Sequence, residues 1–180
     1  MLRRVVSLFV VLACSGDEIM GGFSGTANSI LVVNNDAAQS SLTGTGANTS
    51  ETILKTVTLP ALAANSMIDI DALVSWTSSA NSKTFRVRLG GIGGTILYSS
   101  TVTTSASLQQ KIICRNNNSV SSQKFFAVAA GYASSSSAIS TGSVNTGVSV
   151  TLVFTGQLSA GAATALDSIS YEASTVQVIL

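Results

Sequence analysis

The sequence contains no histidine, and it has only two cysteines and one proline among 180 residues. Without histidine, a nucleophilic serine has no imidazole to act as its base, so Ser-His-Asp hydrolysis is excluded. Cys14 and Cys114 form no ligand-spaced cluster, which leaves zinc and haem almost no candidate ligands. We expect two free, largely buried thiols, with one long-range disulfide as the alternative. The sequence therefore predicts no catalytic residue, no cofactor and no metal ion.

Charge is also scarce, because charged residues make up 9% of the chain against roughly 25% in ordinary soluble domains. The net charge of +1 gives little long-range field, which argues against nucleic-acid binding and against an anionic membrane surface. Hydrophobic residues reach 46%. A free monomer with so little charge tends to associate. The composition therefore favours a subunit of a large assembly.

The N-terminal segment allows two interpretations. Arg3 and Arg4 precede an apolar run over residues 5–13, and Cys14 follows it as in a lipoprotein cleavage box. The run is too short to span a bilayer. The segment is either such a signal, with a membrane contact only if Cys14 is lipidated, or a retained hydrophobic arm. Such an arm would add a strand to a partner chain or pack on it.

The rest of the chain divides into a linker and a β domain. Residues 30–33 predict a lone short strand, and residues 37–50 are rich in Gly, Ser and Thr, which is typical of a linker. From residue 51 onward, alternating segments recur between turn residues, with no helical period. We therefore predict an arm and linker over 1–50, and over 51–180 an all-β, antiparallel β-sandwich of about eight strands.

The clearest pattern predicts a hairpin of residues 68–77 and 83–89. Its inward parity holds Val74, Trp76 and Phe85, and the preferred register sets Val74 opposite Phe85. That register also pairs the outward carboxylates with arginines across the hairpin. The outward carboxylates are Asp69 and Asp71, and the arginines are Arg86 and Arg88.

Several groups of residues allow both a functional and a structural interpretation. Gly90, Gly91, Gly93 and Gly94 follow a strand but precede no helical pattern, so they predict a bulge or a tight strand connection rather than a dinucleotide site. Asp69 and Asp71 share a face, as a glycosidase or metal site requires, but exposed ion pairs explain them better. The lysines that could form a Ser–Lys dyad lie in no recognisable motif; they are Lys55, Lys83, Lys111 and Lys124.

Two surface features remain. Arg86 and Arg88 with Lys83 could form a basic stripe, but the near-zero net charge argues against nucleic acid. Leu54, Leu73 and Val153 fall at outward parity among polar neighbours, which suggests a homo-oligomer contact, and the serine run 134–137 predicts an exposed loop tip.

The segment ILKTVTLPALAANSMIDIDALVSWTSSANSKTFRVRLGG resembles β-sandwich domains in virion proteins of tailed bacteriophages. The matching positions are Pro60, Trp76, Asn81, Lys83, Arg86 and Gly90. The later VTLVFTGQLS and ISYEASTVQVIL look like the closing strands of such jelly-roll domains, so the resemblance covers roughly residues 51–180.

This resemblance implies a non-enzymatic virion structural protein, such as a capsid decoration, head fibre or tail fibre component, commonly a trimer. The protein would be located in the virion, and its partners would be other virion proteins. A host surface receptor is a further candidate partner. The N-terminal arm would attach it to the particle. The alternative is a secreted or lipid-anchored bacterial surface module, at the cell surface or in the periplasm.

Overall fold

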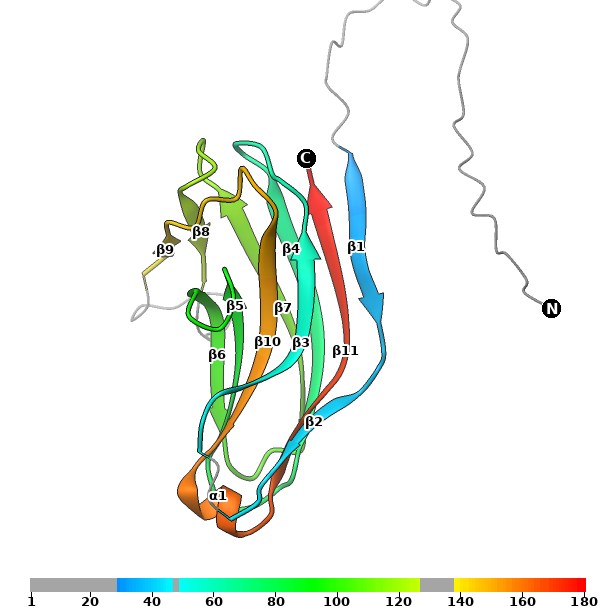
Figure 1. Cartoon of the computed structure of the whole chain (residues 1–180), viewed down its shortest axis with the longest axis vertical. Coiled ribbons are helices and arrows are strands. Elements are labelled where there is room, and N and C mark those ends of the chain that lie inside the picture. Colours follow the sequence, from blue (N-terminus) through cyan, green and yellow to red (C-terminus); the bar gives the residue numbers. More distant parts are fainter. Residues whose placement is uncertain (1–28, 47–48, 127–137) are drawn as a thin grey trace, which may run out of the picture.

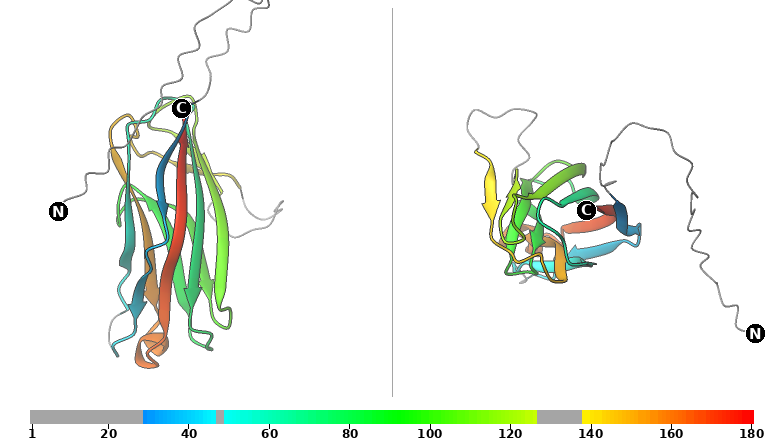
Figure 2. Two further views of the ribbon diagram at one scale, coloured as in Figure 1. Left: turned by 90° about the vertical axis from the view of Figure 1, so that its right-hand side faces the viewer. Right: turned by 90° about the horizontal axis from the view of Figure 1, so that it is seen from above.

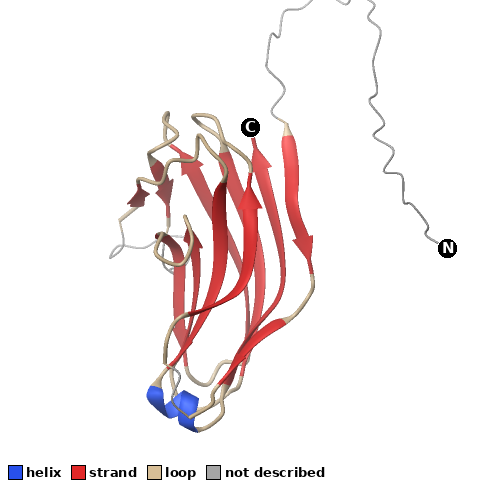
Figure 3. Cartoon of the chain, viewed as in Figure 1, coloured by secondary structure: helices blue, strands red, loops and turns tan. Residues whose placement is uncertain are grey.

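The computed structural model describes residues 29–46, 49–126 and 138–180. Within these ranges the chain forms eleven strands and one short helix, and the strands make two antiparallel sheets (Figures 1 and 3). The two sheets bury their facing sides against each other, as alternating apolar and polar residues require. The predicted all-β sandwich is therefore confirmed.

The larger sheet has seven strands in the order β1-β11-β4-β7-β8-β9, and β2 also pairs with β11. Figure 2 shows β1, β11, β4 and β7 side by side in its left view. The bounds are β1 Ile30–Asp36, β2 Ser40–Thr43, β4 Met67–Trp76, β7 Ser107–Asn116, β8 Gln123–Phe125, β9 Ser140–Gly142 and β11 Ser168–Ile179.

The smaller sheet has four strands in the order β3-β10-β5-β6. Their bounds are β3 Thr52–Leu59, β5 Lys83–Leu89, β6 Thr95–Val102 and β10 Val150–Leu158. The helix α1, Ala160–Thr164, links β10 to β11 at one end of the sandwich, and Ser159 caps it by accepting from the Ala162 N–H. No helix in the described ranges has the length and apolar character needed to cross a membrane.

The hairpin predicted for residues 68–89 is wrong. β4 pairs with β11 and β7, whereas β5 pairs with β10 and β6, so the two strands belong to different sheets. Residues 77–82 cross between the sheets, which pack about 10 Å apart. Alternation along a strand predicts which side chains point inward. It does not separate the two arrangements, because a hairpin and a crossing between sheets bury the same alternate residues of both strands.

The inward faces of both strands are confirmed. Val74 and Phe85 are fully buried, and Trp76 is 6% exposed. The rings of Phe85 and Phe154 stack with centroids 6.3 Å apart, and Phe154 lies 5.3 Å from Tyr171 of the opposite sheet. The contact between Phe154 and Tyr171 therefore joins the two sheets within the core.

The interpretation of residues 37–50 as a linker is wrong for part of that range. β2 lies within it, pairs with β11, and buries Leu42. The predicted strand at residues 30–33 is part of the longer β1, which pairs with β11. A four-residue strand rich in Ser and Thr shows too little alternation of apolar and polar residues to be predicted from the sequence. The predicted arm and the Cys14 motif lie outside the described residues.

A bulge changes part of the predicted oligomer surface. The register of β3 against β10 shifts at Leu54, which turns this side chain inward and leaves it 7% exposed. Val153 is also buried, so Leu54 and Val153 are not exposed, although both were predicted to point outward. Leu73 is the exposed member of the three, at 42%.

The glycine-rich segment after β5 is a tight connection to β6, as predicted. Gly90 and Gly91 adopt φ of +92° and +83°, a left-handed conformation that favours glycine. A Cβ on Gly94 would lie 2.0 Å from the Leu89 carbonyl oxygen. A strand follows these glycines, so the dinucleotide-binding alternative has no structural support.

Candidate functional site

The outer face of the larger sheet carries a cross-strand row of polar side chains. Asn35 lies opposite Thr175, Thr175 opposite Asp71, and Asp71 opposite Lys111. Side chains alternate along a strand, and the neighbours of these residues in β11 and β4 point into the core, so the row faces outward. Four strands from four distant parts of the sequence thus contribute to one surface.

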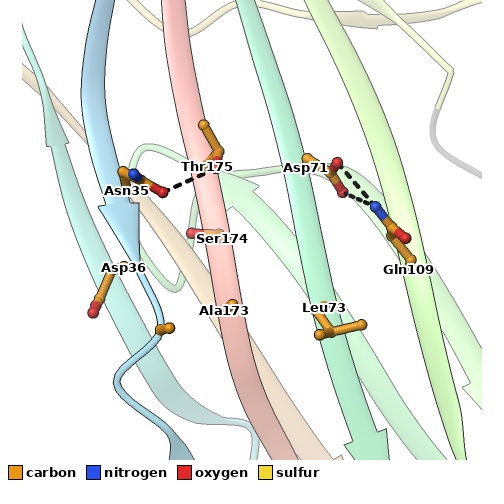
Figure 4. A pocket seen from close by; sticks show the side chains of 9 residues that line it. Asn35, Asp36, Asp71, Leu73, Gln109, Ala173, Ser174 and Thr175 are labelled. Atoms are coloured by element: carbon orange, nitrogen blue, oxygen red, sulfur yellow. Dashed lines mark hydrogen bonds between the residues drawn. The ribbon is translucent and has the colours of Figure 1, made fainter.

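A depression of about 440 Å³ lies beside this row (Figure 4). Both Asp71 carboxylate oxygens accept from Gln109 Nε2, at 3.2 and 3.1 Å, and Thr175 Oγ1 donates to Asn35 Oδ1 at 3.3 Å. Leu73 adds an exposed apolar side chain. The depression therefore offers a carboxylate, two amides, a hydroxyl and one apolar contact to an approaching molecule.

A second, smaller depression of about 200 Å³ adjoins the first and shares Asp71 and Thr175 with it. Its other lining residues include Asp69 and Lys111, whose Nζ lies 3.0 Å from Asp69 Oδ2. One ammonium group thus stands beside two carboxylates. The surface around Asp71 is consequently negative, which favours a cationic or hydrogen-bonding partner over an anion.

A bulge in β11 shapes the end of the larger depression. The register shifts between Tyr171 and Ala173, within the single strand of residues 168–179. The bulged residue, Glu172, accepts hydrogen bonds from Ser75 Oγ and from Gln39 Nε2. The small Ala173 side chain follows it and helps to leave the surface hollow.

At the rim of the depression, Asp36 accepts a hydrogen bond from Lys55 Nζ. This bond lowers the pKa of Asp36 and raises the pKa of Lys55, and the Ala38 N–H also lowers the pKa of Asp36. The pair ties β3 of the smaller sheet to the edge strand β1. Asp36 is therefore neutralised within the chain, which leaves Asp71 as the unpaired carboxylate of the depression.

No protein-family model matches this chain. No curated protein matches it either. Among solved structures, it has a weak likeness to two of infectious bursal disease virus. The structure of the Gx strain is 8% identical over 85% of this chain and 40% of that one, with a TM-score of 0.29. The crystal structure of the VP2 subviral particle is 14% identical over 87% and 42%, with a TM-score of 0.26.

This chain thus spans about two-fifths of the length of each of those viral chains. Likeness at these TM-scores says nothing about what the chain does. The function must be inferred from the surfaces of the molecule itself.

The ion pairs predicted between the two aspartates and the two arginines are wrong. Asp69 and Asp71 lie on the outer face of the larger sheet, whereas Arg86 and Arg88 extend from the smaller sheet and pair with Glu51. The arginines therefore form no free basic stripe. The error follows directly from placing β4 and β5 in one hairpin.

A serine and a lysine do meet at the crossing between the sheets, but the pair is structural. Lys83 Nζ donates to Ser79 Oγ at 2.8 Å and lies 3.7 Å from Asp167 Oδ2. The hydrogen bond from Ser79 lowers the pKa of Asp167, and the Lys83 side chain beside them is fully buried. A fully buried ammonium group is out of reach of a substrate, which a Ser–Lys dyad must contact.

The remaining sulfur and metal candidates add no site. Burial raises the pKa of the Cys114 thiol to about 12, which makes it unreactive, and Cys114 is a free cysteine. Cys14 and the serine run 134–137 lie outside the described residues. In the described ranges, no three side chains of the metal-binding types lie close enough to hold an ion.

Sequence reasoning singled out Asp71 and Leu73 but missed the rest of the depression. Asn35, Gln109 and Thr175 reach it only through strand pairings between distant segments. None of them belongs to a local motif. Alternation predicts that Thr175 points outward, but it does not predict which side chains lie beside Thr175 across the sheet.

Proposed function

We propose that this chain is a non-enzymatic structural subunit of a virion, held in an assembly with further copies and other virion proteins. The observation that carries the proposal is the apolar edge of β1. Ile30 is 63% exposed, Leu31 44% and Val32 51%. The resemblance of residues 51–180 to virion proteins of tailed phages then specifies the kind of assembly.

The edge of β1 is unusual because three consecutive apolar residues are exposed. Consecutive side chains point to opposite faces of a strand, so both faces of β1 are apolar at this end. β1 also ends the order of the larger sheet, and an edge strand presents unpaired backbone groups. Leu180, 46% exposed, extends the apolar surface, since its N–H donates to the Ser29 carbonyl at 3.0 Å. A neighbouring subunit would cover this edge.

The N-terminal segment joins the chain at the same place. Ser29 directly precedes β1, whose first residues form the apolar edge. We propose that this segment attaches the protein to the particle as an arm, in a capsid decoration, head fibre or tail fibre. The phage resemblance favours a trimer as the unit, with other virion proteins and a host receptor as further partners.

The apolar edge can be tested with the full-length chain. We expect Leu31→Lys combined with Val32→Lys to lower the mass of the assembly in light scattering, because charges block edge-to-edge association. Ile92→Lys is the matched control, since Ile92 is 44% exposed in the β5–β6 turn. A wild-type chain that stays monomeric at micromolar concentration would contradict the proposal.

A bacterial surface module, secreted or lipid-anchored, is the second candidate, favoured by the signal-like start of the sequence. Mass spectrometry of the native chain separates the two. An intact Met1 supports the virion arm, whereas a diacylglyceryl group on an N-terminal Cys14 supports the surface module.

A further inference from the structure

Most charged side chains in the described ranges are paired within the chain. The ion pairs are Lys55 with Asp36, Lys83 with Asp167, Arg86 and Arg88 with Glu51, and Lys111 with Asp69. Within the same ranges, the charged residues that make no ion pair are Arg115, Lys124, Asp71 and Glu172. All four lie on the outer face of the larger sheet.

The two positive residues lie directly opposite each other. Arg115 of β7 and Lys124 of β8 are cross-strand partners, and both are exposed. Like charges placed directly opposite each other destabilise an antiparallel pair. A carboxylate from another molecule would relieve this repulsion.

The two negative residues lie further along the same face. The hydrogen bonds to Asp71 come from Gln109, and those to Glu172 from Gln39 and Ser75, so neutral groups satisfy both carboxylates without cancelling their charge. Lys111 of β7 lies opposite Asp71 and is four residues from Arg115. Asp71 and Arg115 are therefore about 13 Å apart along the strands.

We propose that the outer face of the larger sheet binds the same face of a second copy of this chain about a two-fold axis. Arg115 and Lys124 of each copy lie against Asp71 and Glu172 of the other. The depression beside Asp71 gives a protruding arginine or lysine side chain room to enter. This two-fold contact is separate from the contact within the proposed trimer. It names a second partner surface of the proposed virion subunit, and so it rests on that proposed function.

A second copy fits this face better than an unrelated partner because the face is self-complementary. A two-fold axis lying in the interface, midway between the positive and the negative residues, brings the positive end of each face over the negative end of the other. The smaller sheet offers no such pattern. Its arginines, Arg86 and Arg88, already share Glu51 within the chain.

The exposed apolar residues of the outer face and the area of that face also suit a stable contact. Ile113, two residues from Arg115, is 41% exposed, and Leu73, two residues from Asp71, is 42% exposed. The four strands β1, β11, β4 and β7, about 4.8 Å apart and about ten residues long, present roughly 600 Å² per copy. Two copies would bury about 1,200 Å², the lower end of the standard range for specific interfaces.

The test uses two charge-reversed forms of the full chain. One carries Arg115→Glu with Lys124→Glu, and the other carries Asp71→Lys with Glu172→Lys. We expect each form alone to have a dissociation constant for self-association raised at least about tenfold, measured by sedimentation velocity at low ionic strength. Mixing the two forms should restore association, because every contact in the mixed pair again joins opposite charges.

Controls separate this contact from folding and from general charge effects. Thr84→Glu with Thr101→Glu places two carboxylates on a cross-strand pair of the smaller sheet, and it should leave association unchanged. Circular dichroism and thermal melting confirm that each variant is folded. High salt should weaken the wild-type contact, since exposed ion pairs are screened.

Three outcomes would overturn the inference. A reversed form that associates like the wild type would show that these charges lie outside the contact. Two folded forms that fail to associate when mixed would show that the charges do not face one another. In either case the proposed function stands if the wild-type chain still assembles. The third outcome is a wild-type chain that never assembles, which overturns both the inference and the proposed function.

Discussion

The guanidinium of Arg88 donates to both carboxylate oxygens of Glu51, with Nε 2.7 Å from Oε1 and Nη2 2.8 Å from Oε2. Arg86 Nη1 adds a third bond at 3.2 Å. Burial alone would raise the pKa of Glu51, but the hydrogen bonds from Arg88 and Thr155 outweigh it, so the pKa is lowered. The cluster therefore fixes the residue before β3 to the neighbouring strands β10 and β5.

This cluster predicts that the protein loses stability in acid. A carboxyl group whose pKa is lower in the folded state contributes stability that is fully present above its unfolded pKa. That contribution disappears as the pH falls through the folded pKa, below the ordinary carboxyl value of about 4. The pKa values of Asp36 and Asp167 are lowered too, so all three groups act in the same direction. Denaturant unfolding across this pH range measures the loss.

Glu51→Gln isolates the contribution of the cluster. At neutral pH we expect it to lower the free energy of unfolding by about 1–3 kcal/mol, because two arginines lose a charged acceptor. The variant should also lose less stability in acid than the wild type. If the pH dependence of the variant matches that of the wild type, Glu51 does not contribute to it.

Trp76 is predicted to be a major source of core stability. The side chain is 6% exposed, and Trp76→Ala should lower the free energy of unfolding by about 3–5 kcal/mol, because it leaves a large cavity. Among the described residues, its buried Nε1 has no hydrogen-bond partner, so Trp76→Phe should cost much less. A loss below about 1 kcal/mol for the alanine variant would contradict the burial.

The sequence predicted the faces of the strands better than their partners. The parity of Val74, Trp76 and Phe85 follows from the two-residue period alone, and the structure buries all three. The pairing of β4 with β7 and β11 depends on segments far away in the chain. Residues 77–82 are long enough to cross between sheets, and nothing in their composition distinguishes a crossing from a hairpin turn.

The candidate site was harder to predict for the same reason. Asp71 was recognised as outward, yet its neighbours Gln109 and Thr175 come from β7 and β11. A local pattern also fails where a bulge intervenes, since one extra residue at Leu54 reverses which side chains point inward. Bulges and pairings are decided by the whole sandwich, so a single strand does not reveal them.

The turn between β5 and β6 predicts opposite effects for two neighbouring glycines. A Cβ on Gly94 would lie 2.0 Å from the Leu89 carbonyl oxygen, whereas a Cβ on Gly93 would meet no atom within 4 Å. Gly94→Ala should lower the free energy of unfolding by about 1–3 kcal/mol, because the backbone must shift. Gly93→Ala should be nearly neutral. Equal melting temperatures for the two variants would contradict this geometry.

The N-terminal segment is predicted to be needed for attachment but not for folding. Deleting residues 1–28 keeps β1 whole, so the pairing of β1 with β11 and the bond from Lys55 to Asp36 are retained. We expect the truncated chain to melt within a few degrees of the full chain but to be absent from purified particles. The measurements are thermal melting and the occupancy of the protein in the particles.

Deleting residues 1–33 is the informative comparison. This longer deletion removes the apolar half of β1, including Ile30 and Val32, and exposes the edge of β11 that β1 covers. It should therefore lower the melting temperature as well as prevent incorporation, because the backbone hydrogen bonds of β11 lose their partners. If the chain lacking residues 1–28 enters particles at normal occupancy, attachment must come from the described sandwich. The contacts across the larger sheet and the β1 edge would then be the surfaces that hold it in place.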